Sequence, residues 1–389
     1  MAGFDIQTSA PGKILLIGSY SVLERPNPGY VVTVDARVHV RLRYLENRKV
    51  RVSAPQFNVS GEGSIDPKTG NFDFALPKGM AVLKAAVEVP IKYLISIGAD
   101  IPGFYLEAYN DAGFASGGSK IAKSGLGSSA GVTVAGITAA LAASKHGSEA
   151  LKMDKELIHK LAQLSHSIAT GKIGSGFDVA AATYGSIIYT RYSQSLVGSL
   201  PEDYNGDDIA KAVKGNWDYS VESFGLPGRL GMVFANFVNE SASTISLVSK
   251  VFEFKKRDPD RYGEIMKRLN AANLDALDAL KNMEKGDRVM LESFMEHFEK
   301  GRHLTKELGR LANVDIEPDD CSQLIDRSKE NGAFVAKLPG SGGKDSIVAL
   351  TTKKADRQRL TDYLNSVNGL RVIDLNADNA GVRVDNVIS

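Results

Sequence analysis

A glycine-rich segment ahead of a long apolar run is the strongest chemical feature of the sequence. Residues 123–131 read KSGLGSSAG, so Gly125 and Gly127 alternate with small and hydroxyl-bearing residues. A helix that begins here would direct its unpaired N–H groups and the positive end of its dipole toward an anion, and glycines let the backbone approach that anion closely. The segment predicts a phosphate cradle, although a buried helix with a serine N-cap explains the same residues equally well.

Two other nucleotide-binding motifs fit this segment less well. Residues 125–130 match G-x-G-x-x-A, but a dinucleotide fold needs a second parallel strand that ends in an acid about 20 residues further on. We expect another helix at that place, so Glu149 and Asp154 are misplaced for the role. A Walker A loop, G-x-x-x-x-G-K-S/T, does not occur in the sequence.

Three further segments carry residues suited to phosphate chemistry. SAPGKILLIGSYSVL places Lys13 between a Pro-Gly turn and an apolar strand, and GKIGSGFDVAAATYG places Asp178 at the start of an alanine-rich helix. KLPGSGGKDSIVAL forms a second glycine loop between two expected strands. Each has an ordinary explanation as well, since Lys13 fits a solvated lysine after a turn and Asp178 fits a helix N-cap.

Taken together, the four segments resemble the GHMP kinase family, and its three motifs occur here in the family's order across both halves of the chain. The resemblance implies an α+β fold of two domains. These are a ribosomal-protein-S5-like nucleotide-binding domain at residues 1–215 and a ferredoxin-like domain at residues 216–389. It also implies ATP as co-substrate and Mg²⁺ as cofactor.

Within the family, GKIGSGFDVAAATYGSIIYTRY is most similar to the members that phosphorylate (R)-5-phosphomevalonate to (R)-5-diphosphomevalonate. Three alternatives stay open: a mevalonate kinase or another small-molecule GHMP kinase, a related decarboxylase, and a fold of this family used only for ligand sensing. The last alternative predicts the loss of Lys13 or Asp178, and both residues are present.

The resemblance assigns roles by position. It implies Lys13 and Asp178 as catalytic residues and Ser129 as a Mg²⁺ ligand. The nucleotide would contact Lys123, Ser124, Gly125, Leu126, Gly127, Ser128, Ser129 and Ala130. The acceptor would contact Ser19, Tyr20, His166, Lys172, Ser175, Arg191, Ser243, Gly340, Gly342 and Gly343. Among these, only the guanidinium of Arg191 can hold a phosphate with two parallel hydrogen bonds.

The chain departs from its relatives in two places. Mevalonate kinases and galactokinases usually show G-E-H after the first strand, where this chain has Gly18, Ser19 and Tyr20. Those relatives also place a Mg²⁺-binding glutamate before the catalytic aspartate, but no acidic residue lies between Glu156 and Asp178. Ser129 is therefore the only matched metal ligand.

Composition narrows the class of protein. The 389 residues carry 47 Lys and Arg against 46 Asp and Glu, so the net charge of +1 predicts neither nucleic-acid nor membrane binding. The single cysteine, Cys321, excludes an internal disulfide and favours a reducing, cytoplasmic setting. No run approaches the roughly 18 apolar residues that span a bilayer. We expect small-molecule partners, and the sequence leaves open whether the chain forms a homodimer.

The elements that must position these residues follow from periodicity and turn signals. Residues 65–78 are expected to be loop and residues 201–227 an interdomain stretch. Expected strands cover 14–17, 30–34, 38–44, 50–53, 105–109, 186–192, 230–237, 333–338 and 346–350, with one more near Leu370. Expected helices cover 80–97, 130–144, a segment from an N-cap at Ser148 to Gly171, several between 242 and 331, and 355–367.

Overall fold

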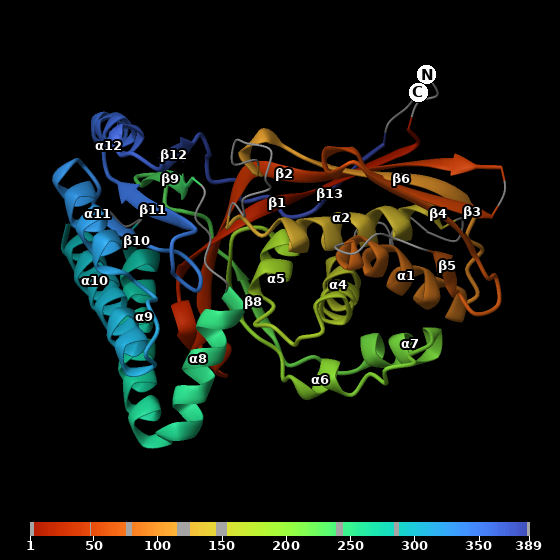
Figure 1. Ribbon diagram of the computed structural model, residues 1–389, viewed down its shortest axis with the longest axis horizontal. Helices are drawn as coiled ribbons and strands as arrows, with labels where there is room; N and C mark the ends of the chain where they lie inside the picture. The colour runs from red at the N-terminus through yellow and green to blue at the C-terminus, as the bar shows by residue number, and fades with distance from the viewer. Residues whose placement is uncertain are drawn as a thin grey trace.

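The computed structural model describes residues 4–46, 48–74, 80–114, 125–144, 154–238, 244–283 and 288–386. Two β-sheets with helices packed against them make up this part of the chain (Figure 1). This confirms the expected α+β class. In the described ranges no helix combines the length and apolar character needed to cross a membrane.

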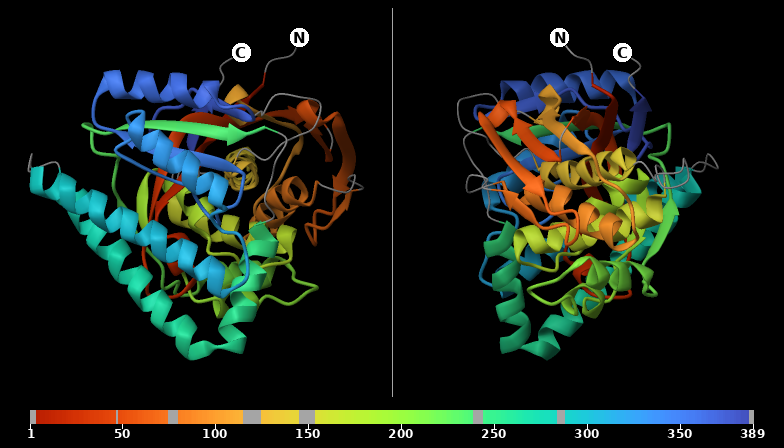
Figure 2. Two further views of the ribbon diagram at one scale, coloured as in Figure 1. Left: turned by 60° about the vertical axis from the view of Figure 1, so that its left-hand side comes forward. Right: turned by 90° about the vertical axis from the view of Figure 1, so that its right-hand side faces the viewer.

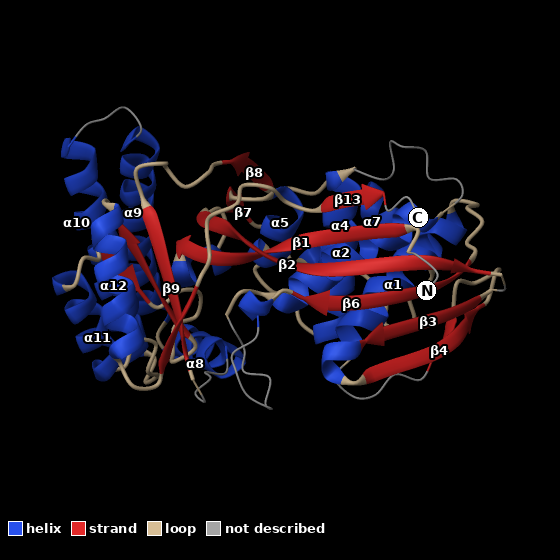
Figure 3. Cartoon of the chain, turned by 90° about the horizontal axis from the view of Figure 1, so that it is seen from above, coloured by secondary structure: helices blue, strands red, loops and turns tan. Residues whose placement is uncertain are grey.

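The first sheet comes mainly from the amino-terminal half of the chain. Its strand order is β13-β1-β2-β6-β3-β4-β5, with β7 pairing to β2 and β8 to β7, and Figure 3 shows it from above with helices behind it. β13 brings the end of the chain beside its beginning. The strands are β1 (Ile6–Ile17), β2 (Gly29–Leu45), β3 (Lys49–Ala54), β4 (Val59–Ile65), β5 (Phe72–Phe74), β6 (Gly103–Asn110), β7 (Ile187–Thr190), β8 (Ser220–Ser223) and β13 (Arg383–Asn386).

Helices cover one face of this sheet (Figure 1). They are α1 (Ala81–Ser96), α2 (Ser128–Ala143), α4 (Lys155–Thr170) and α5 (Phe177–Tyr184), with α6 (Ser195–Gly198) and α7 (Gly206–Lys214) further from the sheet. α2 is buried along most of its length, since it lies between the sheet and the helices α1 and α4. Its residue Val134 shares an apolar cluster with Val40 and Leu106 of the sheet. This packing fixes the position of the amino terminus of α2.

The second sheet has the order β10-β11-β9-β12, with every pairing antiparallel. Numbered along the chain, its strands follow the order 2-3-1-4, the ferredoxin-like arrangement that the resemblance implied. Two long helices, α9 and α10, lie side by side against it (Figure 2). The elements are β9 (Gly231–Phe237), α8 (Thr244–Arg257), α9 (Pro259–Asn282), α10 (Arg288–Leu311), α11 (Asp319–Glu330), β10 (Val335–Lys337), β11 (Ser346–Thr351), α12 (Lys354–Ser366) and β12 (Leu370–Ile373).

A shared apolar cluster joins the two sheets. It contains Ile14 of β1 and Val32 of β2, together with Phe234 of β9, Leu280 of α9 and Phe294 of α10. Burying each such side chain contributes about 1.5–3 kcal/mol. The cluster therefore holds the second half of the chain against the end of β1 that carries Lys13.

Several expectations about local structure were wrong. The strands expected at 30–34 and 38–44 form one strand, β2, and the loop expected at 65–78 contains β5. The helix expected from Ser148 begins at Lys155, because Asp154 caps it by accepting hydrogen bonds from two backbone N–H groups. Ser148 itself lies outside the described residues. Gly171 ends this helix as expected, with a φ of 64°.

Residues 201–227 are not a simple interdomain stretch. They form α7, which packs on α1, and β8, which pairs with β7. Between these elements Trp217 is buried against Tyr192, with ring centroids 4.8 Å apart. β8 and β13 both lie beyond residue 215 and pair within the first sheet, so the division of the chain at 215 and 216 stays a prediction.

Candidate active site

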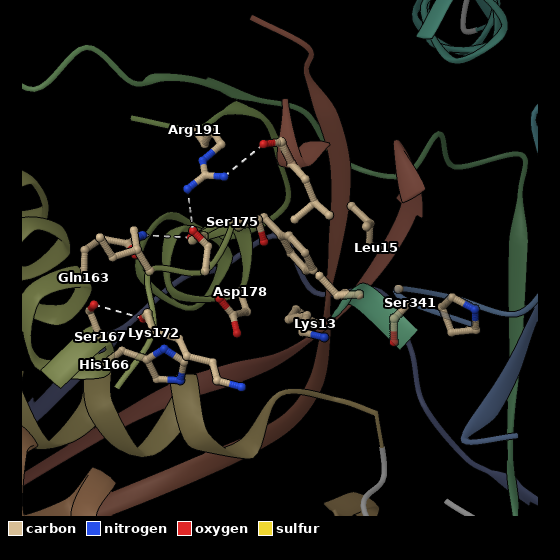
Figure 4. Close-up of a pocket in the computed structure, with 18 of the residues that line it drawn as sticks. Lys13, Leu15, Gln163, His166, Ser167, Lys172, Ser175, Asp178, Arg191 and Ser341 are labelled. Carbon is tan, nitrogen blue, oxygen red and sulfur yellow. Dashed lines mark hydrogen bonds between the residues drawn. The ribbon is translucent and has the colours of Figure 1, made fainter. Parts of the chain in front are cut away.

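A cavity of about 710 Å³ lies where the two halves of the chain meet. Its walls come from β1, from α4 and α5 with the loop between them, from α8, and from the glycine loop before β11. Figure 4 shows Lys13, Asp178 and Lys172 directing their charged ends toward one space, with His166 beside them. Lys13 and Asp178, which are 165 positions apart in the sequence, thus face the same cavity.

Lys13 reaches this space from β1. Its backbone N–H donates to the Leu126 carbonyl at 2.9 Å, and its Nζ donates to the Gly125 carbonyl at 3.1 Å. Burial lowers the pKa of the Lys13 ammonium, and the negative charges of Asp178 and Asp345 oppose that shift. The lysine therefore contacts the expected phosphate cradle through both its backbone and its side chain.

The cradle has the local conformation that anion binding requires. Gly125 and Gly127 adopt φ values of 70° and 78°, a region that favours glycine. Gly127 is the N-cap of α2, and among the described residues no side-chain cap bond is made there, which leaves the first N–H groups of the helix for a ligand. Leu126 and Ala130 are fully buried and anchor the turn. Lys123 and Ser124 lie outside the described residues.

The two serines of the cradle begin α2. Ser128 is its first residue, and the Oγ of Ser129 lies 3.2 Å from the Nε2 of His166. The expected metal ligand and one expected acceptor residue are therefore neighbours. In the part of the chain that the structure describes, no three His, Cys, Asp or Glu side chains are grouped as a metal site.

Asp178 lies in the first turn of α5. The N-cap of this helix is Gly176, with a φ of 76°, and it has no side chain to cap the helix. The Oδ1 of Asp178 accepts a hydrogen bond from the Val179 N–H at 2.9 Å. The Asp178 carboxylate lines the cavity. In Figure 4 it lies across the cavity from Ser341, which belongs to the glycine loop before β11.

Arg191 is held differently from what the sequence suggests. It lines the cavity, but its Nη1 donates to the Leu23 carbonyl at 3.0 Å and its Nη2 to the Gly174 carbonyl at 2.8 Å (Figure 4). Burial lowers the pKa of this guanidinium. Arg191 thus supports both the loop that carries Ser175 and the end of the short helix Ser19–Leu23, and a direct contact with the acceptor stays a prediction.

Ser19 and Tyr20 lie away from the cavity wall. The Tyr20 hydroxyl donates to the Ser341 carbonyl at 3.0 Å, and its ring packs in a core cluster of the second half. The Ser19 Oγ lies 3.3 Å from the Oγ1 of Thr305 in α10. The two hydroxyls thus hold the short helix Ser19–Leu23 against the second half of the chain. The sequence instead predicted that they contact the acceptor. Ser243 lies outside the described residues.

The glycines of the second glycine loop have two different roles. Gly340 lines the cavity together with Pro339 and Ser341. Gly342 and Gly343 instead anchor the loop: a Cβ at Gly342 would lie 2.3 Å from the Ile316 carbonyl, which accepts a hydrogen bond from the Gly343 N–H at 2.8 Å. Of the three glycines expected to contact the acceptor, Gly340 lines the cavity, and its contact with the acceptor stays a prediction.

Sequence reasoning missed several residues of the cavity wall. Asp345 follows the glycine loop directly, so its position in the motif was a usable signal. Phe177 and Ser346 adjoin Asp178 and Asp345 in the quoted motifs, so they too had a usable signal. Gln163, Val248 and Phe252 carry no local signal, because helix packing brings them to the cavity.

Comparisons with known proteins agree with this geometry. The sequence profile described as GHMP kinases N terminal domain matches residues 80–186, and the one described as GHMP kinases C terminal matches residues 253–369. The phosphomevalonate kinase of Saccharolobus solfataricus is 32% identical, with 98% of this chain and 99% of that protein covered. That of Candida albicans is 28% identical, with 96% of each covered.

Solved structures share the fold. Streptococcus pneumoniae phosphomevalonate kinase in complex with phosphomevalonate and AMPPNP matches with a TM-score of 0.75 and 19% identity, covering 96% of this chain and 100% of that one. Methanococcus jannaschii mevalonate kinase matches with a TM-score of 0.65 and 18% identity, covering 97% and 100%. Because both matches are this distant in sequence, they support the fold and leave the acceptor to be argued from the site.

Proposed function

Since the chain belongs to the GHMP kinase family of phosphotransferases, we propose that it transfers the γ-phosphoryl group of ATP to (R)-5-phosphomevalonate, giving (R)-5-diphosphomevalonate. The observation that carries the proposal is one cavity lined by Lys13, Asp178, Lys172 and Arg191 beside the uncapped start of α2. Relatives that share 26–32% of their residues over nearly the whole chain and are named phosphomevalonate kinase support the choice of acceptor.

The start of α2 would hold the ATP phosphates. Its free N–H groups and helix dipole attract an anion, and Gly125 and Gly127 allow close approach. Gly340 and Ser341 line the same cavity from the second half of the chain. The nucleotide would therefore be enclosed between the two halves, which restricts access of water to the transferred group.

Lys13 would neutralise charge on the transferred phosphoryl group. Phosphoryl transfer depends mainly on positioning and on electrostatic stabilisation, and a lysine held at Gly125 would lie next to phosphates bound at the start of α2. The neighbouring carboxylates of Asp178 and Asp345 favour its charged form against the effect of burial. The cation is thereby kept in a partly desolvated place where it acts strongly.

Asp178 would orient the acceptor. A phosphomonoester has a second pKa of about 6, so its oxygens are largely ionised at neutral pH and a strong general base is not required. The carboxylate would accept the residual proton and direct one phosphate oxygen toward ATP. Lys172, His166 and Ser175 line the same region and would hold the rest of the acceptor phosphate.

The residues fit a magnesium ion bound mainly through ATP. Mg²⁺ usually binds proteins through one or two carboxylates and substrate phosphates while keeping several waters. Ser129 stands at the cradle, and Asp178 and Asp345 line the cavity, so hard oxygen donors surround the phosphate site. When bound, the ion would supply further neutralisation of phosphate charge.

The remaining assignments are cytoplasmic placement and the oligomeric state. Cys321, the single cysteine, is buried as a free thiol, which suits a reducing compartment. One relative is named as peroxisomal, so imaging of the tagged protein in its own cells is the direct test. Sedimentation of the purified protein tests the homodimer that the sequence leaves open.

The reverse reaction tests the acceptor. Moving a phosphoryl group from ATP to a phosphomonoester exchanges one anhydride for another, so the equilibrium constant should lie within roughly tenfold of unity. Purified protein given ADP and 5-diphosphomevalonate should therefore form ATP, measured by luciferase. Transfer to an alcohol converts an anhydride into an ester and runs strongly forward.

A matched variant excludes a contaminating kinase. Asp178→Asn keeps a side-chain oxygen that can accept from the Val179 N–H, so it should fold normally and lose both directions of the reaction. Failure to form ATP, together with rapid phosphorylation of mevalonate, would replace the proposal with a mevalonate kinase.

A further inference from the structure

Gln163 is a buried polar residue of the cavity wall to which the reaction outlined above gives no role. It lies on α4, its side chain is 3% exposed, and it borders the cavity behind the loop that leads to α5 (Figure 4). An amide at such a place is costly unless its donors and acceptor are used. The hydrogen-bond partners of Gln163 therefore indicate which part of the structure it holds in place.

Both N–H groups and the oxygen of the amide have partners. The Nε2 donates to the Gly176 carbonyl at 2.8 Å and lies 2.9 Å from the Nε2 of His159. The Oε1 accepts from the Tyr192 hydroxyl at 3.2 Å. Rotating the amide by half a turn would set its oxygen against the Gly176 carbonyl, so only one orientation satisfies these contacts.

His159 completes the arrangement on the far side of Gln163. It is fully buried among aromatic rings, including Tyr184, Trp217 and Tyr219. Burial, with a smaller contribution from Lys160, lowers the pKa of His159 to about 3. The imidazole is therefore neutral at neutral pH, and its Nε2 can accept the second N–H of Gln163. This contact fixes Gln163 from behind.

Gly176 is the point at which Gln163 acts on the site. A Cβ at Gly176 would lie 2.7 Å from the Oε1 of Gln163, so only glycine permits this approach. Gly176 is also the N-cap of α5, and its carbonyl accepts the first helical hydrogen bond, from Ala180 at 3.0 Å. The N-cap residue has no side chain, and the Gln163 amide holds its carbonyl from α4, two residues before Asp178.

We propose that Gln163 is a positioning residue that sets the carboxylate of Asp178 by holding the Gly176 carbonyl at the start of α5. This rests on the proposed function, since it assigns Asp178 a part in the reaction. The amide adds a hydrogen bond at the start of α5 to the packing of α4 on α5, which includes the contact of His159 with Tyr184. Without it, the cavity side of α5 can shift while the nucleotide cradle at α2 stays in place.

Replacing the Gln163 amide with an apolar side chain tests whether Gln163 acts on the position of Asp178 and not on the binding of ATP. In Gln163→Leu, kcat should fall roughly 10- to 100-fold, because displacement of a reacting group by about 1 Å has effects of that size. The KM for ATP should stay within about twofold of wild type, since the cradle is untouched. Ser165→Ala is the matched control: its side chain is buried on the same helix and its hydroxyl has no hydrogen-bond partner among the described residues.

A second variant gives a readout that a merely structural residue would not produce. In Gln163→Glu the introduced carboxyl can donate to the Gly176 carbonyl only while it is protonated, and burial raises its pKa. The kcat of this variant should therefore be highest at low pH and fall as the carboxyl ionises, relative to wild type over the same range. The neutral His159, the Tyr192 hydroxyl and Arg191 face this region and are common to both proteins.

Hydrogen exchange tests the same idea without any substrate. Amides of residues 174–184 should exchange faster in Gln163→Leu than in wild type, and those of residues 128–143 should not change. Unchanged exchange in residues 174–184, or a kcat within about twofold of wild type, would overturn the role of Gln163. Failure of the wild-type protein to phosphorylate phosphomevalonate would instead refute the proposed function, and the exchange data would still decide whether Gln163 holds α5.

Discussion

At the scale of the residue, Lys13 carries a charge that the proposed reaction needs but that lowers the stability of the folded protein. Burial lowers the pKa of its ammonium despite two carboxylates nearby, so the folded protein holds this charge at a cost. A lysine with a lowered pKa in the folded state binds its proton less tightly there than in the unfolded chain. Stability should therefore rise with pH between the folded and unfolded pKa values of this group.

Lys13→Met should consequently be more stable and inactive. Loss of the buried charge should stabilise the fold by roughly 1 kcal/mol at neutral pH, a usual size for relief of functional strain. The gain in Tm over wild type should shrink as pH rises and Lys13 of the wild type loses its proton. Calorimetry from pH 7 to pH 10.5 measures this, and a variant that is less stable than wild type at pH 7 would contradict it.

At the scale of the element, the turn before α2 depends on a contact as well as on a dihedral angle. Gly127 and Gly98 both have a φ of 78°, so a valine at either place meets the same backbone strain. They differ in surroundings: a Cβ at Gly127 would lie 2.7 Å from the Cε of Lys13, whereas nothing lies within 4 Å of one at Gly98.

Comparing valine at Gly127 with valine at Gly98 separates the effect of the cradle on ATP binding from the effect of backbone strain. Gly127→Val should raise the KM for ATP at least about tenfold, because it displaces Lys13 and places bulk where the backbone meets phosphate. Gly98→Val should lower stability by about 1–3 kcal/mol and leave the KM for ATP unchanged. Equal effects of the two variants on KM would show that backbone strain alone is responsible. Isothermal titration with ATP measures the affinity directly.

At the scale of the whole molecule, the end of the chain secures the first sheet. Arg37 of β2 is 5% exposed and donates to the carbonyls of Ser9 and Gly381 and to the carboxylate of Asp378. Arg383 binds the same carboxylate from the surface, with its side chain 48% exposed. The buried cation thus joins β1, β2 and the segment that leads into β13.

The two arginines provide a matched comparison. Arg37→Met should lower the free energy of unfolding by about 3–5 kcal/mol, because it leaves buried acceptors without their partner. Arg383→Met should lower it by less than about 1 kcal/mol, as exposed ion pairs usually do. Urea denaturation of both variants measures the difference. Similar losses would mean that the Asp378 charge, and not burial of Arg37, is what stabilises this junction.

The class of the fold and the residues of the candidate site could be predicted from local sequence patterns. Lys13, Asp178 and the glycines at 125 and 127 are recognisable because each motif is continuous and demands particular residue types: a cation, a carboxylate, and backbone with positive φ. Helices such as α1 and α2 were predicted within a few residues for a similar reason, since periodicity is a local property of the chain.

Which of the candidate residues line the cavity could be seen only in the folded chain. Ser19 and Tyr20 follow Lys13 closely in sequence, yet their hydroxyls are used to seat a short helix against the second half. Arg191 has the right charge, but each of its terminal nitrogens donates to a backbone carbonyl, and its contact with the acceptor stays a prediction. Gln163 carries no motif and is placed by the packing of α4 on α5. The positions of these side chains depend on hydrogen-bond partners that are distant in sequence, so no local pattern of residue types predicts them.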